Sequence, residues 1–287
     1  MRDMGDIALV IYSALLWSLL DVSRKKLSQH LSPPAAVVWL SLGSLPFFLA
    51  WAVADGEWIQ DSSYVLVGGP IVLLQLLANV LFIQAVQISP LSLTVPFLSL
   101  TSVFSAGFAF LALQEHLVPV QWIGIGGVLF GSFFLREGLR KKAHSSRLEV
   151  GGVLMIVVAL IWSVTSALDK VALRSASVPA HALIQTVGVG AISLLWLVVR
   201  GNLRELASVR QIWKVFAFAV VALTAAQALQ LLAIRSVPVG LVESLKRGLG
   251  LLASVLLGRL VFAEELTRAK LTAAVFMGLG SALLILG

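Results

Sequence analysis

Long apolar runs, each sufficient to cross a lipid bilayer as one helix, make up most of this sequence. A crossing helix takes about 20 residues, and proline, glycine or charged residues separate each run from the next. The expected spans are 6–27, 34–54, 64–86, 91–113, 118–136, 150–172, 179–199, 212–234, 238–260 and 268–286. We therefore predict an all-α integral membrane protein with ten transmembrane helices.

The composition agrees with a protein that lies in a bilayer. Only 12% of the residues are charged, 59% are apolar, and the mean hydropathy is +0.98. Soluble proteins average about 25% charged residues, so this charge is too sparse to cover a water-facing surface. The net charge of +7 arises from short basic clusters between apolar runs, the pattern of cytoplasmic loops. No nucleic-acid partner is expected.

Several functional classes are excluded by what the sequence lacks. Without cysteine there is no disulfide, zinc–thiolate site or cysteine nucleophile. His30, His116, His144 and His181 lie in loops or at helix ends without an HExxH motif, and neither GxSxG nor a Gly-Lys-Ser/Thr phosphate loop occurs. No enzymatic activity, cofactor or metal site is expected. The run from Ile7 to Leu20 lacks the features of a cleavable signal peptide and is interpreted as the first span.

The two halves of the sequence repeat each other. A Trp-Ser pair with lysine eight positions after the tryptophan occurs twice, 145 residues apart, as Trp17, Ser18 and Lys25 and as Trp162, Ser163 and Lys170. A Glu-x-Leu sequence before a glycine-rich span recurs 149 positions apart, at Glu115 and Glu264. We therefore predict a first five-helix repeat over 1–136, a polar linker over 137–149 and a second repeat over 150–287.

Five spans is an odd number, so the second repeat is expected to be inverted relative to the first. Inverted repeats are typical of secondary transporters, which bind substrate near the midplane between the halves. Lys and Arg concentrate in the loops after spans one, five, seven and nine, including Arg24, Lys25 and Lys26. This bias predicts that those loops are cytoplasmic and that both termini lie outside.

The ninth span carries the strongest candidate site. A charge at the centre of a membrane helix costs about 2.5–3.5 kcal/mol and should face a cavity or a partner, and this span holds Glu243, Lys246 and Arg247. One reading is an internal ion pair between Glu243 and Arg247, with Lys246 reaching toward the headgroups. The other is a cavity lining whose excess positive charge suits a carboxylate or phosphate. Glu243 is then a counterion or a proton-coupling acid.

Spans one, three, six and eight carry further candidates. Lys25 and Lys170 occupy equivalent positions near opposite membrane surfaces and are predicted gate charges, with Asp21 and Asp169 as counterions, although helix-end cations also reach toward headgroups. Trp17 is a predicted substrate contact. The amides of Gln75, Asn79 and Gln227 are predicted to line the cavity, the alternative being hydrogen bonds between helices.

These motifs together resemble the EamA-type transporter family of the drug/metabolite transporter superfamily. The matching elements are Trp17-Ser18 with Lys25, Glu115-His116-Leu117 with Gly124 and Gly131, Trp162-Ser163 with Lys170, and Glu264-Glu265-Leu266 with Gly280. Ser18 and Ser163 replace a glycine common in the family. The resemblance implies a basket in which the inner four helices of each half enclose a central cavity, while the fifth and tenth pack outside. It also implies export or exchange of small metabolites.

The expected function is secondary active transport of a small anionic or zwitterionic metabolite by alternating access in a bacterial plasma membrane. The amino acids and their derivatives, carboxylates and phosphate-bearing metabolites are the candidate substrates. Spans one, three, four, six, eight and nine are expected to line the cavity. The alternatives are a flippase for lipids or lipid-linked sugars and a non-transporting membrane partner or sensor. Expected partners are the substrate and membrane lipid, with a coupling proton as a further candidate. The two fused halves predict a monomer or a weak homodimer.

Overall fold

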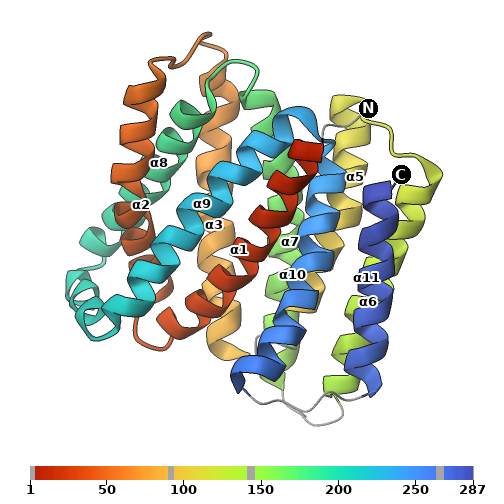
Figure 1. Cartoon of the computed structure of the whole chain (residues 1–287). Coiled ribbons are helices and arrows are strands. Elements are labelled where there is room, and N and C mark those ends of the chain that lie inside the picture. Colours follow the sequence, from red (N-terminus) through yellow and green to blue (C-terminus); the bar gives the residue numbers. More distant parts are fainter. Residues whose placement is uncertain (1–3, 90–93, 141–145, 263–267, 287) are drawn as a thin grey trace.

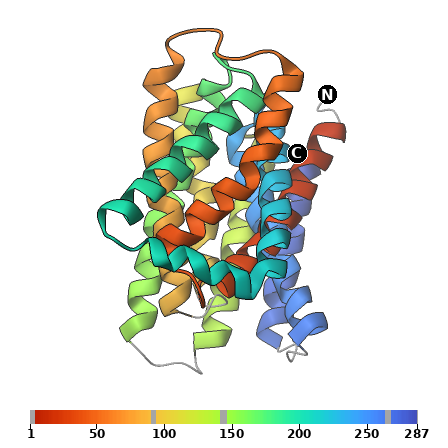
Figure 2. The same cartoon turned by 90° about the vertical axis from the view of Figure 1, so that its left-hand side faces the viewer.

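The computed structural model describes residues 4–89, 94–140, 146–262 and 268–286, apart from the side chains of 135–140, 146–149, 208, 210, 211, 254–262 and 270. These residues form helices joined by short links (Figures 1 and 2). The first half contains α1 (Met4–Leu27), α2 (Pro33–Asp55), α3 (Tyr64–Ile88), the 3₁₀-helix η1 (Val95–Ser99), α5 (Leu100–Leu113) and α6 (Pro119–Arg140). The second half contains α7 (Ser146–Ala172), α8 (Val178–Val199), the 3₁₀-helix η2 (Leu203–Ile212), α9 (Trp213–Ser236), α10 (Val239–Phe262) and α11 (Arg268–Leu286).

Each predicted span coincides with helix in the structure. Seven described segments are long and apolar enough to cross a bilayer by length and composition. The apolar parts of α6 and α11 are shorter, and α10 carries Glu243, Lys246 and Arg247 in its interior. The chain is an all-helical membrane protein whose described residues form ten membrane helices in two repeats. The helices α6 and α7 extend into the predicted linker 137–149, of which 141–145 lie outside the described residues.

Local sequence signals set several helix ends. Proline stands in the first turn of α2 and α8, where its missing N–H is not needed and its fixed φ suits the helix. Gly56 ends α2 in the left-handed region, at φ 71°, and its N–H donates to the Ala52 carbonyl at 3.2 Å. A residue with a Cβ would be strained at that φ, so the glycine allows the chain to turn sharply into the next link.

The two repeats run in opposite directions. Helix α1 begins at the end of the bundle where both termini lie, whereas α7 begins at the opposite end (Figure 1). The main helix pairs join the repeats and occur twice: α1 packs against α9 and α10, and the equivalent α7 packs against α3 and α5. Helix α2 packs against α8, and α5 against α10. These contacts close a ring of eight membrane helices among those described.

The fifth helix of each repeat, α6 and α11, packs outside the ring against its counterpart (Figure 1). Small residues allow this contact to be very close. A Cβ atom on Gly280 would lie only 2.7 Å from the carbonyl oxygen of Gly124 and 2.8 Å from the backbone nitrogen of Val128. These atoms belong to backbone and cannot move aside easily. Glycines therefore set the distance between α6 and α11.

Two elements differ from the expected pattern. The fourth span was predicted as one helix over 91–113, but its described part begins with η1, which contains Pro96, before α5 starts at Leu100. Helix η2 occupies a segment that was predicted as a loop. It lies against α2, where Trp39 Nε1 donates to the Leu206 carbonyl at 2.9 Å. This contact is made across 167 residues of sequence, so no local pattern reveals it.

Candidate functional site

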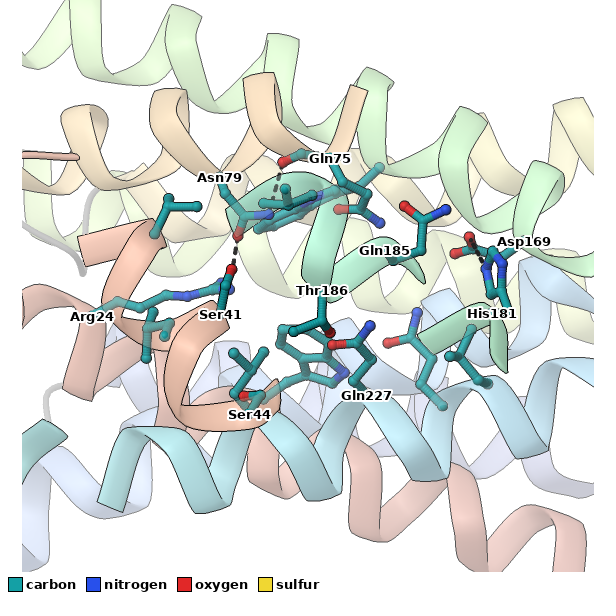
Figure 3. Close-up of a pocket in the computed structure, with 18 residues that line it drawn as sticks. Arg24, Ser41, Ser44, Gln75, Asn79, Asp169, His181, Gln185, Thr186 and Gln227 are labelled. Atoms are coloured by element: carbon teal, nitrogen blue, oxygen red, sulfur yellow. Dashed lines mark hydrogen bonds and ion pairs between the residues drawn. The ribbon is translucent and has the colours of Figure 1, made fainter. Parts of the chain in front are cut away.

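A cavity of about 800 Å³, including its opening, lies between the two repeats (Figure 3). Helices α1, α2 and α3 line it from the first repeat, and α7, α8 and α9 from the second. Its uncharged polar lining is made of amide and hydroxyl side chains, namely those of Ser41, Ser44, Gln75, Asn79, Gln185, Thr186, Gln227 and Gln230. Such a lining offers many hydrogen bonds to a small polar molecule.

The helices that line this cavity correct one prediction. Spans four and nine were expected to line it, and spans two and seven were not. In the structure α2 and α8 line the cavity, while α10 faces a smaller one. Sequence reasoning missed α2 and α8 because their polar residues are single hydroxyls, an isolated glutamine and, near the start of α8, His181, all in strongly apolar helices. Such residues carry no charge that would have singled them out.

The smaller cavity, of about 370 Å³, adjoins the larger one and is lined by α1, α3, α7, α9 and α10. Four side chains line both cavities and form the partition between them, namely those of Trp17, Gln75, Trp162 and Gln230. The smaller cavity is also lined by Asp21, Thr165, Ser166, Lys246 and Arg247. The charges of the ninth span are thus grouped with the repeat-equivalent tryptophans.

The three charged residues of α10 form a compact buried cluster. Lys246 Nζ lies 2.5 Å from Glu243 Oε1, and Arg247 Nη2 lies 3.8 Å from Glu243 Oε2. Ser166 Oγ donates to Glu243 Oε1 at 2.9 Å, and Arg247 Nε donates to Thr101 Oγ1 at 3.0 Å. Both cations are 7% exposed, and Lys246 does not reach toward the headgroups. The internal ion pair and the cavity-lining position are therefore both present.

Each repeat-equivalent tryptophan receives one cation of α10. Lys246 Nζ lies 5.5 Å from the Trp17 ring centroid, and the Arg247 guanidinium lies 5.4 Å from that of Trp162. At these distances the negative face of the indole attracts a cation. The tryptophans of the repeated motif therefore hold the charges of the ninth span between the two halves.

Arg24 is the cation of the larger cavity. It is only 3% exposed, although it lies in the last turn of α1 and was counted among the loop cations. Its Nη2 donates to Asn79 Oδ1 at 2.9 Å, and its Nη1 lies 3.7 Å from Asp21 Oδ1. The guanidinium also lies 5.5 Å from the Trp17 ring centroid. Helix-end position suggested a solvated residue, but the tilt and packing of α1 bury it.

Three N–H donors in this region have no acceptor. Arg24 Nε, Arg24 Nη1 and Trp17 Nε1 are buried and make no hydrogen bond to any described residue. An unpaired buried donor costs about 1–3 kcal/mol, and more when the group is charged. The surrounding charges add to this imbalance. Among the described residues, the three cations Arg24, Lys246 and Arg247 have two acidic partners, Asp21 and Glu243. With all five ionised, one positive charge is left without a partner.

The opposite end of the larger cavity holds Asp169 (Figure 3). Asp169 Oδ1 lies 3.0 Å from His181 Nε2, and the other ring nitrogen of His181 lies 2.8 Å from the Tyr64 hydroxyl. All three side chains are buried, and His181 is fully so. Asp169 is the repeat equivalent of Arg24, because each directly precedes the lysine of the repeated motif: Arg24 precedes Lys25, and Asp169 precedes Lys170. The cavity is thus positive at one end and acidic at the other.

The two predicted gate lysines bind helix C-termini at equivalent places. Lys25 Nζ donates to the carbonyls of Val86 and Ser89 at the end of α3, and Lys170 Nζ donates to that of Val237 at the end of α9. A cation is stabilised there by the negative end of the helix dipole. This position satisfies carbonyls that the helix itself leaves unpaired.

Lys170 also takes part in a contact between the repeats. Its Nζ lies 2.6 Å from Glu115 Oε1, and Glu115 Oε2 accepts a hydrogen bond from the backbone N–H of Val239 at 2.8 Å. Glu115 lies a few residues before the start of its own following helix, α6. The structure places its carboxylate at the first residue of α10. We refer to Glu115, Lys170, Val237 and Val239 as the clasp.

Comparison with known families decides what kind of protein has this architecture. The model of the EamA-like transporter family matches residues 4–136 and 150–286. The chain belongs to the EamA-like transporter family. It is therefore a membrane transporter, and this is not an enzyme family. A search of curated proteins gives no match.

The fold of this EamA-like transporter is also found among solved structures. One, described only as "Crystal structure of protein", aligns with a TM-score of 0.79 at 18% sequence identity. The alignment covers 100% of this chain and 99% of that one. At this identity the likeness establishes the ten-helix fold and says nothing of the substrate.

The structure brings most of the predicted site residues of the transporter together. The larger cavity is lined by five of them, namely Trp17, Gln75, Asn79, Gln227 and Asp169. The smaller cavity is lined by Trp17, Gln75, Asp21, Lys246 and Arg247, with Glu243 directly behind its two cations. Lys25 and Lys170 lie apart from both lists of lining residues, at the helix ends already described.

Sequence reasoning missed other residues of the site. Arg24 shares a helix face with Trp17 and Asp21, and that spacing was the available signal. Trp162 was noted as the equivalent of Trp17 but was not included among the predicted substrate contacts.

His181 and Tyr64 were also missed, because they lie 117 residues apart in sequence and carry no shared motif. Only the packing of α3 against α7 and α8 brings them to Asp169.

Proposed function

We propose that this transporter is a secondary carrier for a small metabolite that bears a carboxylate or phosphate, such as an amino acid or its derivative. The observation that carries the proposal is the group of unpaired buried donors at Arg24 and Trp17. An oxyanion of the substrate would accept from them and offset the excess positive charge. A guanidinium suits this role because its planar fork binds carboxylate or phosphate through two hydrogen bonds.

The rest of the larger cavity would bind the remainder of the substrate. Its amides and hydroxyls come from both repeats, including Asn79 and the repeat-equivalent Gln227. Side chains on both repeats can follow a substrate as one repeat moves relative to the other, which alternating access requires. Asp169 at the opposite end would favour a zwitterion that carries a positive or donating group away from its carboxylate.

The charged cluster of α10 keeps the role proposed from the sequence, which is to attract the anionic group of the substrate. It consists of Glu243, Lys246 and Arg247. The two cations would attract the anion toward the partition formed by Trp17 and Trp162. We assign Glu243 as their counterion, because Lys246 and Ser166 donate to its carboxylate and Arg247 lies close to it.

Alternating access requires contacts between the repeats that can break, and we propose that the clasp is one of them. It joins the α5–α6 link of the first repeat to the C-terminal end of α7 and the start of α10 in the second. Glu57 and Ser177 add contacts at the same end of the bundle, where Ser177 Oγ donates to the Glu57 carbonyl at 2.7 Å. The described conformation would accordingly be closed at the end where both termini lie.

Breaking the clasp is expected to open this end. In Lys170→Met, a cysteine placed at the buried Val237 should react with a maleimide at least about tenfold faster than in the parent, which corresponds to about 1.4 kcal/mol of lost closure. The chain has no native cysteine, so Val237→Cys is the sole thiol. The matched control is Lys26→Met, which removes an exposed lysine of α1. An unchanged rate in Lys170→Met would show that the clasp does not hold this end closed.

The transport proposal is tested with purified protein and defined probes. Thermal unfolding is measured with amino acids, dicarboxylates and sugar phosphates, and the probe that raises the unfolding temperature is then used for counterflow into liposomes. We expect counterflow of at least one anionic or zwitterionic probe. Movement of labelled phospholipid between leaflets without any counterflow would favour the flippase. Neither activity would favour a non-transporting sensor.

The proposed location is the plasma membrane of a bacterium, with both termini outside. Arg24 no longer counts among loop cations because it is buried in the cavity. The basic residues Lys26, Arg200 and Arg204 remain exposed at the end of the bundle opposite the termini, which keeps the positive-inside bias. A cytoplasm-active reporter fused after the last residue should be inactive in this orientation.

A further inference from the structure

The acidic end of the cavity contains a hydrogen-bonded chain of three buried titratable side chains. Tyr64 of α3, His181 of α8 and Asp169 of α7 are connected through the two ring nitrogens of His181, at 2.8 and 3.0 Å. Asp169 and His181 both line the larger cavity, while Tyr64 lies behind them. A histidine with a carboxylate on one side and a hydroxyl on the other can exist in two charge states without losing either contact.

The hydrogen bonds of the uncharged state are fixed by the partners. Because Asp169 accepts only, His181 Nε2 carries a hydrogen and donates to it. The other nitrogen, Nδ1, then accepts from the Tyr64 hydroxyl. In this state the three side chains together carry one negative charge, which belongs to Asp169. A buried charge without a neutralising partner is costly inside a membrane protein.

The charged state also needs an acceptor for the Tyr64 hydrogen. When His181 carries a second proton, Nδ1 donates to the Tyr64 oxygen, and the Tyr64 hydrogen must find another acceptor. Gln185 lies one turn further along α8, interacts with Tyr64 and has a buried Oε1 that makes no hydrogen bond to any described residue. Its amide nitrogen is engaged with the Gly68 carbonyl at 3.1 Å. A rotation of the Gln185 amide that turns Oε1 toward the Tyr64 hydroxyl would supply this acceptor and give the unpaired carbonyl oxygen a partner.

We propose that Tyr64, His181 and Asp169 form a binding site for the coupling proton, with His181 as the group that is charged and Gln185 as the acceptor that completes the charged state. The physiological role of this site rests on the proposed transport function. The proton cancels the charge of Asp169 within the acidic end of the cavity. It lies at the far end of the cavity from Arg24, so a proton and an anionic substrate would occupy separate places (Figure 3).

The position of the site connects proton binding to the clasp. Asp169 directly precedes Lys170, whose ammonium pairs with Glu115. Among Glu115, Asp169, Lys170 and His181, the two carboxylates outnumber the single ammonium while His181 is neutral. When His181 is charged, cations and carboxylates in this group of four are equal in number. Proton binding therefore stabilises the closed clasp. By linkage, opening of this end favours proton release.

The other charged groups near this end do not neutralise Asp169. Among the described residues, α2 and α9 contribute only uncharged side chains to the cavity lining here. Asp61, in the link before α3, is exposed and accepts from the backbone and hydroxyl of Ser63. Arg174 and Arg235 are exposed at the ends of their helices. The neutralising charge must therefore come from His181 itself.

The test measures clasp opening against pH and uses no substrate. The sole thiol of Val237→Cys is labelled in purified folded protein at pH 5.5 and 8.0, and each rate is divided by the rate for the same chain unfolded, which removes the pH dependence of the thiol. The normalised rate is expected to be at least about tenfold higher at pH 8.0. In His181→Gln the ratio of the two rates should fall to within about twofold of unity, and Tyr64→Phe should give an intermediate ratio.

The matched control is His116→Gln, because His116 is an exposed histidine in the α5–α6 link at the same end of the bundle. It should keep the full pH dependence. Thermal unfolding of every variant verifies that it is folded. Nitrogen-15 NMR of a chain in which His181 is the only histidine gives a second readout that does not depend on labelling.

Three results would overturn the proton site: a pH-independent rate in the parent, a pH dependence that persists in His181→Gln, or a His181 ring that stays neutral over this pH range. If His181→Gln is unfolded, the NMR measurement on the parent histidine decides alone. Because neither measurement uses substrate, a failed counterflow experiment would reject the transport proposal and leave this result standing, and the reverse also holds.

Discussion

Replacing Glu243 with glutamine is expected to destabilise the protein by about 3–5 kcal/mol, the usual cost of removing one partner from a buried ion pair. The carboxylate is the only described acidic group in direct contact with both Lys246 and Arg247. Glutamine preserves the shape and the hydrogen bond from Ser166, but it leaves both buried cations without their counterion. The midpoint of unfolding in a detergent titration measures the loss.

A second substitution separates charge from packing. In Glu243→Gln/Lys246→Gln the net charge of the α10 cluster returns to that of the parent, so most of the lost stability should be recovered. Glu57→Gln, at an exposed position in the α2–α3 link, should change stability by less than about 0.5 kcal/mol. A double variant no more stable than Glu243→Gln would mean that Glu243 contributes through its packing or its hydrogen bonds.

Replacing Arg24 with glutamine is expected to weaken binding of the anionic probe about 100-fold, equivalent to about 2.7 kcal/mol. Two hydrogen bonds from a charged donor are lost, each worth about 1.5–3 kcal/mol before the remaining contacts adjust. Arg24→Lys keeps the charge but not the planar fork, so its loss should be about tenfold. Calorimetric titration of the probe selected in the unfolding screen gives the affinities.

Two controls accompany this measurement. Arg235→Gln removes an exposed arginine at the end of α9 and should leave affinity unchanged. Asp21→Asn/Arg24→Gln removes the Asp21 carboxylate that Arg24→Gln leaves without its cation, and it should bind the probe as weakly as Arg24→Gln. Undiminished affinity in Arg24→Gln would place the anion elsewhere, with Lys246 and Arg247 as the remaining cations.

The sequence predicted the membrane fold well because the bilayer imposes a simple rule. A stretch of about 20 apolar residues must cross as a helix, and proline and glycine separate the stretches. The Trp-Ser and lysine motif then identified the two repeats. Lys25 and Lys170 lie at the ends of α3 and α9, and these partners were not foreseen, because backbone carbonyls at helix ends carry no sequence signal.

The candidate site was predicted only in part. Helical spacing identified residues that share one face, such as Trp17 and Asp21, or Glu243 and Arg247. It could not tell how deeply a helix end is buried, so Arg24 was assigned to a loop. It also gave no reason to associate Tyr64 or Gln185 with Asp169, since these residues lie on three different helices.

The amino-acid sequence alone determined the number of spans, their internal duplication, the opposite direction of the two repeats and the presence of costly charges within α10. These properties depend on hydropathy, periodicity and an odd number of crossings, which are local or countable. The tertiary structure alone decided that Arg24 and Asp169 face each other along one cavity, that Glu115 reaches Lys170 in the other repeat, and that Gln185 keeps an unpaired carbonyl beside Tyr64 and His181. Contacts between helices depend on how each one is rotated and tilted against its neighbours, and that geometry is fixed only when all of them pack together.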